Sequence, residues 1–260
     1  MQMEQLVVVK LAISLIAILV FLLWERLIPS DNPPVALLSN WKERLSRYAR
    51  NIGLWVINAV LSPLVIVPVS LFFALHALHW RDDFNWIWLD IALLDLWIYW
   101  WHRANHRIPF LWRFHQVHHL DRWLDVTTAF RFHFGEVLLS ALVRGVYIWV
   151  MGIQWQSVLL FESLVLICAT FHHSNSRLPV SLEKPLSMFI ITPSIHWIHH
   201  HAVKADTDSN YGTILSLWDR LFFSLSRTIR SPQMTLGLEG ENDRRLPSLL
   251  YLPLQKSATE

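Results

Sequence analysis

The chain has 260 residues, of which 53% are hydrophobic and 16% charged, and its mean hydropathy is +0.34. Soluble domains usually carry about 25% charged residues, so this deficit argues against an ordinary soluble protein and favours one membrane-embedded body. The net charge of +2 is mild and no basic run with spaced aromatic residues occurs, so we expect no nucleic-acid partner. The single cysteine, Cys168, excludes an internal disulfide and thiolate metal clusters, which leaves imidazole and oxygen as metal ligands.

The first predicted element is a transmembrane anchor. Leu6 to Leu23 carries one charge, Lys10, and is long enough to cross a hydrocarbon core of about 30 Å. A cleaved signal peptide is the alternative, but no Ala-x-Ala-like site follows and the start of the chain is not basic. We therefore assign residues 1–28 to an anchor, residues 29–225 to the main domain and residues 226–260 to a polar C-terminal tail.

A polar connector and a long apolar stretch come next. Pro29 to Arg50 is predicted to be a connector, and its excess of basic residues places it on the cytoplasmic side. Ile52 to Trp80 contains no acidic or basic side chain and exceeds one simple span, so its two prolines should kink it. His76 and His79, at its far end, are interpreted as interfacial residues and not as ligands.

Three further apolar segments should return the chain to the membrane. Phe84 to Trp101 is expected to cross it and to deliver the first histidines to the cytoplasmic face. Val137 to Val150 and Val158 to Phe171 are each short for a full span, so a shallow hairpin is expected. Arg144 and Glu162, one in each member of the hairpin, are predicted to pair with each other.

The most informative feature is a set of histidine boxes. Eight of the fourteen histidines form three of them: His102-x-x-x-His106, His115-x-x-His118-His119 and His196-x-x-His199-His200. Residues three and four apart share a helix face, so each box points its imidazoles at one place. Counting membrane crossings puts all three boxes, and His173, on one side. Neutral imidazole offers one lone pair, and eight such donors exceed the four ligands of a structural zinc site, so two metal ions are implied.

The identity of the metal follows from the donor type only in part. Imidazole and oxygen donors suit iron, zinc, copper, nickel or manganese. A pair of iron ions is our leading hypothesis, because it can supply the two-electron activation of O2 that breaks an unactivated C–H bond, whereas zinc has no redox chemistry. His133 and His173 are single histidines that could complete the metal shell.

Two residues upstream of the first box are candidate positioning groups. Asp95 and Tyr99 lie on one helical face with His102, at positions i, i+4 and i+7. A carboxylate inside a predicted span is a functional candidate by default, so we expect Asp95 to help orient the ligand imidazoles. The alternative is an interfacial carboxylate that pairs with a nearby arginine.

These motifs resemble, in order, those of the fatty acid hydroxylase superfamily, also called the sterol desaturase family. The matching stretches lie between about Leu89 and Leu238: Trp100–His106, Leu111–His119, Arg131–Glu136, His173–Asn175, His196–His200, Asn210–Gly212 and Trp218–Phe222. The sequence departs from the family pattern at two places. Phe134 stands where the family has proline, and Phe222-Phe223-Ser224 stands where it has Phe-Gly-Thr. Both departures put local loop geometry in question.

The resemblance implies an all-α integral membrane helical bundle with a cytosolic helical cap that holds a His-rich dimetal site. It implies a membrane-bound non-haem di-iron oxygenase that takes O2, and two electrons from a separate ferredoxin or cytochrome, to hydroxylate a C–H bond of a lipid such as a fatty acyl chain or sterol. The metal ligands it implies are His102, His106, His115, His118, His119, His133, His173, His196, His199 and His200. His172 and His201 are unmatched neighbours and are left out.

Two alternatives remain open. A desaturase would use the same site. A His-rich metal transporter would place its ligands near the bilayer midplane on broken helices, whereas these boxes follow the ends of predicted spans. The lipid substrate would enter laterally from the bilayer. We expect the bacterial inner membrane rather than the endoplasmic reticulum, because no reticulum-type signal is found at the C-terminus.

Overall fold

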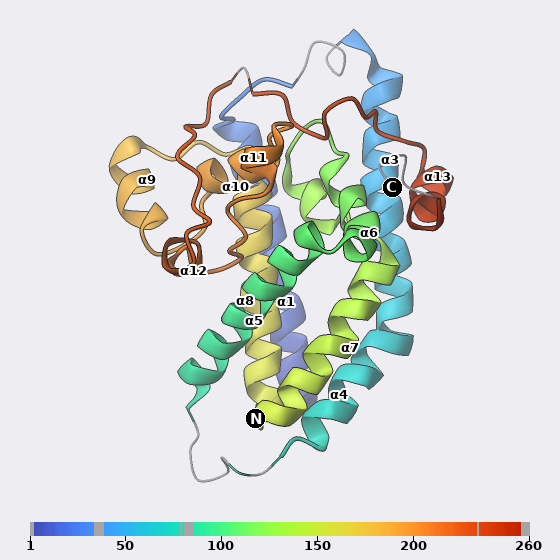
Figure 1. Cartoon of the computed structure of the whole chain (residues 1–260), viewed down its shortest axis with the longest axis vertical. Helices are drawn as coiled ribbons and strands as arrows, with labels where there is room; N and C mark the ends of the chain where they lie inside the picture. The colour runs from blue at the N-terminus through green and yellow to red at the C-terminus, as the bar shows by residue number, and fades with distance from the viewer. Residues whose placement is uncertain (1–2, 34–38, 79, 81–85, 233, 256–260) are drawn as a thin grey trace.

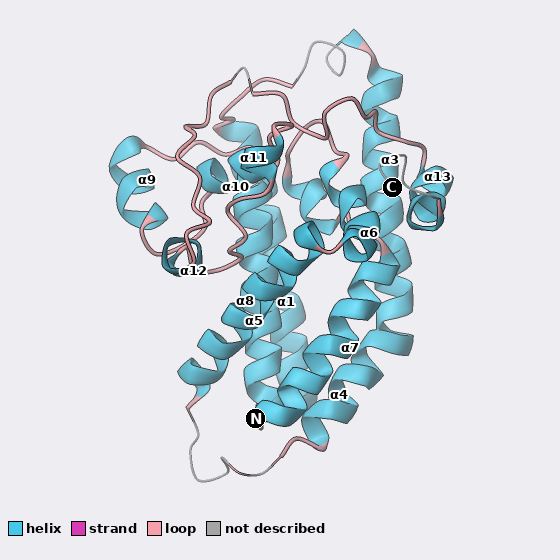
Figure 2. Cartoon of the chain, in the orientation of Figure 1, coloured by secondary structure: helices cyan, strands magenta, loops and turns pink. Residues whose placement is uncertain are grey.

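The structure is a computed structural model that describes residues 3–33, 39–78, 80, 86–232 and 234–255. Long helices form an elongated bundle, and short helices and loops cover one of its ends as a cap (Figure 1). Over the described residues, the secondary structure is helical, with three isolated β-bridges and no strand (Figure 2). The all-α prediction is confirmed.

The helices of the bundle are α1 (Met3–Leu27), α3 (Trp41–Leu61), α4 (Val67–Leu75), α5 (Ile87–Arg107), α7 (Phe134–Met151) and α8 (Trp155–His173). The cap and its surroundings contain α6 (Pro109–His119), α9 (Val180–Ser187), α10 (Pro193–His199), α11 (Lys204–Thr207), α12 (Leu217–Leu221) and α13 (Leu246–Tyr251). In the bundle, α4 packs on α7, while α1 and α5 pack on α8. Leu94, Ile148 and Phe161 join α5, α7 and α8 in one buried apolar core.

Three helical segments of the described chain are long and apolar enough to cross a membrane: Trp41–Leu75, Phe134–Met151 and Trp155–His173. They support a multi-pass membrane protein. With 18 and 19 residues, α7 and α8 are longer than the shallow hairpin expected from the sequence. Gly152, at φ 64°, ends α7 in the left-handed conformation that glycine tolerates, so the chain can turn at once into α8.

Helix α5 differs from these segments because it buries two carboxylates, Asp90 and Asp95. It is not among the helices apolar enough to span, so the crossing expected over residues 84–101 is not supported by hydropathy. A serine hydroxyl of α8 donates to Asp90 at 2.7 Å. Between α7 and α8 the predicted pair is confirmed, with Arg144 Nη2 3.0 Å from Glu162 Oε1.

The two prolines of the long apolar stretch interrupt its helix without ending it. Between α3 and α4 the chain forms a π-helical turn, η1 (Ser62–Ile66), that contains Pro63 and precedes Pro68. Proline lacks the backbone N–H of an α-helical hydrogen bond, and a π-turn accommodates its ring. His76 ends α4, and its Nδ1 lies 2.7 Å from the carbonyl of Phe72. His79 lies outside the described residues.

The expected polar connector is wrong for Trp41–Arg50, which is already the first half of α3. The Asn40 side chain caps the helix by accepting hydrogen bonds from first-turn N–H groups. Arg47 is buried there, and it binds Asp121 at 2.7 Å and Asp125 at 2.6 Å. Because Arg47 neutralises buried carboxylates, it does not count as a free positive charge in assigning the orientation of the chain across the membrane.

The described part of the polar C-terminal segment, residues 226–255 without residue 233, packs against the cap and the bundle. They end in α13 and a 3-10 turn, η3 (Leu252–Leu254). Leu249 is fully buried against Leu54 of α3 and Val117 of α6. The C-terminal segment thereby ties the helix that carries the second histidine box to the bundle.

Candidate metal centre

The histidine boxes lie where the bundle meets the cap. His102 and His106 occupy the last two turns of α5. Ile108 breaks the helix with an extended backbone, and Pro109 opens α6 at its first position, where the fixed φ of proline suits a helix start. The chain therefore turns sharply between the first and second boxes. The third box lies on α10, and His173 is the last residue of α8.

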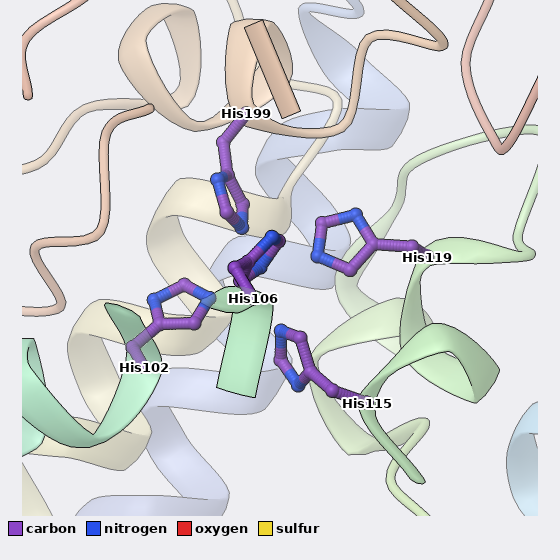
Figure 3. Close-up of side chains that lie close together, drawn as sticks. All are labelled: His102, His106, His115, His119 and His199. Atoms are coloured by element: carbon purple, nitrogen blue, oxygen red, sulfur yellow. The ribbon is translucent and has the colours of Figure 1, made fainter. Parts of the chain in front are cut away.

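A first group of histidines combines all three boxes. The rings point toward a common centre from α5, α6 and α10 (Figure 3). One ring nitrogen of each lies within 4.8 Å of one from every other member. The members are His102, His106, His115, His119 and His199.

A second group lies beside the first. It consists of four buried histidines, again with ring nitrogens within 4.8 Å of one another: His118, His173, His196 and His200. The rings of His119 and His200 belong to different groups and stack at 4.4 Å between centroids, so the two groups are adjacent. Consecutive helical residues point about 100° apart, which lets each His-His pair contribute one ring to each group.

Backbone carbonyls hold four of these rings in one tautomer. The Nδ1 atoms lie close to carbonyl oxygens as follows: His102 to Tyr211 at 2.9 Å, His118 to Arg131 at 3.3 Å, His173 to Ala169 at 2.8 Å and His199 to Ser209 at 2.6 Å. A carbonyl oxygen can only accept, so Nδ1 carries the proton and Nε2 keeps the lone pair. Metal-binding imidazoles are commonly oriented in this way.

The converging nitrogens of the first group lack hydrogen-bond partners within the described structure. Nε2 of His102, His115 and His199 is buried without a hydrogen-bond partner among the described residues. Neither ring nitrogen of His106 or His119 has such a partner there, and one nitrogen of each ring faces the common centre, while His106 Nδ1 lies 3.6 Å from Asp208 Oδ1. Burying a polar atom without a partner costs free energy, and here several such atoms point at one place. A bound cation would satisfy them.

The ring nitrogens of the second group also lack donors among the described residues, as their short contacts with one another show. The Nε2 atoms of His118 and His173 lie 3.1 Å apart, and each ring already carries a proton on Nδ1. Two lone pairs therefore face each other, and a proton between them would create a buried imidazolium that desolvation disfavours. His196 Nε2 lies 2.9 Å from His173 Nε2. This donor set fits a transition metal that prefers imidazole.

Burial also keeps these ligands neutral. Desolvation, together with neighbouring imidazoles, lowers the pKa of His102 to about 3. The same causes hold the pKa of His106, His119 and His199 well below the usual range. The rings are therefore unprotonated at neutral pH, which is the state that binds a metal ion.

Glu136 is a site residue to which the sequence argument assigned no role. It lies in the first turn of α7, and its Oε1 accepts a hydrogen bond from His115 Nδ1 at 2.8 Å. Asn105 Nδ2 donates to the same oxygen at 3.3 Å. A carboxylate in the first turn of a mainly apolar helix is the signal that could have identified it.

His133, predicted as a ligand, lies outside both groups. Its Nδ1 accepts a hydrogen bond from the Gly135 N–H at 2.9 Å and so caps α7, while its Nε2 lies 3.1 Å from the carbonyl of Leu250. Both ring nitrogens are thus engaged elsewhere. His172 and His201, which the prediction left out, are also outside the two groups.

Asp95 and Tyr99 reach the histidines only through a loop. Asp95 accepts hydrogen bonds from two backbone N–H groups of the loop over residues 210–224, which contains the short helix α12. It also accepts one from Trp218 Nε1 at 2.8 Å. The Tyr99 hydroxyl lies 2.8 Å from a serine hydroxyl of the same loop. This loop supplies the carbonyl that binds His102. The two residues therefore hold a support of the site and do not contact its rings.

Comparison with known proteins gives a consistent family. Residues 87–224 match the family model described as fatty acid hydroxylase. The chain is 26% identical to ornithine lipid hydroxylase OlsE from Rhizobium tropici over 184 residues, which are 70% of this chain and 55% of that protein. It is 31% identical to alkylglycerol monooxygenase from Danio rerio over 150 residues, 56% of this chain and 31% of that protein. It is 30% identical to Delta(7)-sterol 5(6)-desaturase erg3B from Aspergillus fumigatus over 144 residues, 55% of this chain and 39% of that protein.

These relatives are longer than the regions matched, since the aligned part spans 55% of the first and 31% of the second. No solved structure matches the chain. The region matched by the family model covers more than half of the chain and contains all nine grouped histidines. The chain therefore belongs to the fatty acid hydroxylase family.

Proposed function

We propose that this protein is a membrane-bound di-iron oxygenase that hydroxylates a C–H bond of a lipid. The observation that carries the proposal is the convergence of nine imidazoles, seven of them on buried residues, in two adjacent groups. The converging nitrogens either lack a hydrogen-bond partner among the described residues or face one another at 2.9 to 3.2 Å. The names of its relatives, which are lipid hydroxylases, monooxygenases and a sterol desaturase, support a lipid substrate.

The two groups would each hold one metal ion. A group of five and a group of four histidines supply enough donors for a pair of ions, and the stacked rings of His119 and His200 join the two groups. Iron is favoured over zinc because C–H oxidation needs a redox-active metal. When bound, such a pair supplies two-electron activation of O2.

The chain's own residues would position the ligands and exclude water. Carbonyls of the cap fix the imidazole orientations, and Glu136 orients the His115 ring by accepting a hydrogen bond from its Nδ1–H. Trp112 packs against the first group, with its ring 5.1 Å from that of His106 and 5.6 Å from that of His119. This indole gives the centre an apolar wall suited to a hydrocarbon chain.

The lipid would approach through the bilayer, because His173 ends α8 and His102 lies near the end of α5, and these two helices pack on each other in the apolar bundle. Electrons would come from a separate ferredoxin or cytochrome that docks on the cap. The cap would face the cytoplasm of a bacterial inner membrane, an orientation that the exposed Lys42 and Arg44 at the start of α3 favour.

The direct test compares cells that express the wild-type chain with cells that express His199→Ala, grown under 18O2. We expect a lipid that gains one 18O atom in the wild-type cells only, and about two iron atoms per purified chain, since five and four ligands form two sites. Zinc in place of iron, or an unchanged lipidome, would contradict the proposal. A product that loses two hydrogens without gaining oxygen would assign the desaturase alternative, which the match to the sterol desaturase favours.

A further inference from the structure

Two short helices lie beside the bundle and contribute no grouped histidine. Helices α9 and α12 lie together on one flank of the molecule, at the left of Figure 1. Backbone and side-chain contacts join them, since the Ser216 N–H donates to the carbonyl of Phe189 at 3.0 Å and Arg220 donates to the carbonyl of Ser187 at 3.0 Å. They form one connected surface.

This surface exposes large apolar side chains, which we call the flank patch. Its members are Met188, Phe189, Leu217, Leu221 and Phe223. Between 49% and 95% of the surface of each residue is exposed, and Phe223 is the most exposed of them. Exposed apolar residues gathered in this way usually mark contact with a protein or a membrane.

Phe223 is also held in an unfavourable backbone conformation. Its φ is 56°, the left-handed region that favours glycine and is unusual for a bulky residue. It follows the end of α12, where the Ser224 N–H donates to the carbonyl of Asp219 at 2.8 Å and closes the helix in the manner of a Schellman motif. Glycine would fit this turn without strain, so the turn itself does not explain why a large exposed aromatic side chain stands at position 223.

The patch lies alongside the bundle and continues its surface. Trp218 of α12 donates to Asp95, which lies two helical turns before the first histidine box on α5. The ring of Phe222 packs on Trp100 of α5 at 4.8 Å, and Trp100 itself is 46% exposed. Helix α5 in turn packs on α8, which is long and apolar enough to cross a membrane, so the patch lies beside a candidate span.

The charges around the patch complement an anionic membrane. Over residues 177–190 and 213–229, all of which the structure describes, the exposed charged residues are Arg177, Lys184, Arg220 and Arg227. The two acidic residues there, Glu183 and Asp219, are half-buried and buried. An apolar face flanked by basic residues suits the boundary between headgroups and acyl chains. A second copy of the chain would bring like charges together.

We propose that the flank patch is immersed in the lipid leaflet nearest the metal centre, with Phe223 inserted among the acyl chains and the basic residues on anionic headgroups. The bilayer then replaces water around the exposed apolar side chains, and the ring of Phe223 gains a favourable environment that offsets its backbone strain. This inference concerns the position of the membrane, and it stands whether or not the proposed reaction is correct.

The experiment uses the full chain in nanodiscs of phosphatidylcholine and phosphatidylglycerol. With Cys168→Ala, the chain has no native thiol, so Phe223→Cys, Leu221→Cys and Lys204→Cys can each be labelled with the fluorophore NBD. Lys204 is exposed on α11 in the cap and serves as the matched control. Doxyl lipids then report contact with acyl chains, and iodide reports contact with water.

We expect labels at positions 221 and 223 to emit at shorter wavelength than the label at 204, to lose most of their emission to doxyl lipids and to resist iodide. The label at 204 should show the reverse. Equal iodide quenching at all three positions would overturn the proposal. Protection from iodide without doxyl quenching would also overturn it, since protein would then cover the patch. Agreement between positions 221 and 223 excludes an artefact of one substitution.

Discussion

Two buried polar clusters at the same end of the bundle differ in whether their polar atoms find partners within the chain. The first is an ion network in which Arg47 of α3 donates to Asp121 and Asp125, with Asn51 donating to Asp121 at 3.0 Å. The second is the histidine centre, where neutral acceptors converge without donors. The charges of the ion network neutralise one another, whereas the described part of the chain supplies no donor or cation for the converging histidine nitrogens.

The protonation states follow from this difference. Burial alone would raise the pKa of Asp121, but the charges of Arg47 and Arg131 lower it to about 2, so this carboxylate is ionised. Burial lowers the pKa of His119 and His199 well below the usual range, so these imidazoles are neutral. A buried cluster of neutral acceptors is therefore a stronger sign of a metal site than a buried cluster of charges, which can neutralise itself.

The largest expected effect comes from removing one ligand of each group. His118→Ala and His199→Ala should each abolish lipid oxidation, because each removes a donor that the protein cannot replace. Metal analysis of the purified proteins should show that each variant loses metal. His76→Ala, on an exposed residue that ends α4, should leave both metal content and product unchanged. Equal activity in all three variants would contradict the ligand assignment.

The ion network should respond in stability and not in metal content. Arg47→Met leaves Asp121 buried without its main partner, which should lower the free energy of unfolding by about 3–5 kcal/mol. Denaturant unfolding in detergent measures this loss. Arg44→Met, on an exposed residue of the same helix, should change stability by no more than about 0.5 kcal/mol. If Arg47→Met instead removed metal from folded protein, the two clusters would not be separable.

A smaller effect should come from changing Glu136, the carboxylate that accepts a hydrogen bond from the His115 ring. Glu136→Gln keeps an oxygen near His115 Nδ1 but removes its charge, so metal affinity should fall about 10–100-fold. Competition with a chelator measures the affinity. Glu162→Gln alters a carboxylate that pairs with Arg144 in the bundle and should leave the affinity unchanged. Equal affinities for the two variants would mean that Glu136 does not tune the ligand.

The smallest effect is a gain in stability at a position outside both clusters. Phe223→Gly relieves a left-handed backbone conformation and should stabilise the protein in detergent by about 1 kcal/mol. Phe223→Ala removes the same ring but keeps a Cβ atom, so it retains most of the strain and separates the two contributions. Thermal unfolding of both variants measures the difference. A loss of stability in the glycine variant would show that the ring packs on the protein.

The sequence predicted which histidines come together where the signal is local. Spacings of three and four residues identified every grouped histidine except His173, which was singled out by its neighbours, because a helix face is set by nearby residues. How the ligands divide between the two groups could not be predicted. His118 and His119 separate because consecutive residues on a helix diverge, and which group receives each depends on how α6, α8 and α10 pack.

Where the structure differs from the expectation, the causes are equally physical. His133 matched a motif, but a histidine before the first turn of a helix can accept a hydrogen bond from the helix N-terminus, and here it does. Arg47 resembled a loop charge, although its acidic partners lie more than 70 residues further along the chain. Pairing at such separations leaves no trace in a local pattern. For the same reason, the role of Asp95 in holding the 210–224 loop could not be foreseen.

That loop has a consequence for handling the protein. One segment of fifteen residues carries both the Tyr211 carbonyl that orients His102 and the exposed Phe223. A change in the surroundings of the Phe223 ring can therefore alter the orientation of the His102 ring. If the centre holds the metal pair proposed above, removing native lipid during purification should also weaken metal binding. The metal content of the purified protein would then report how gently it was extracted.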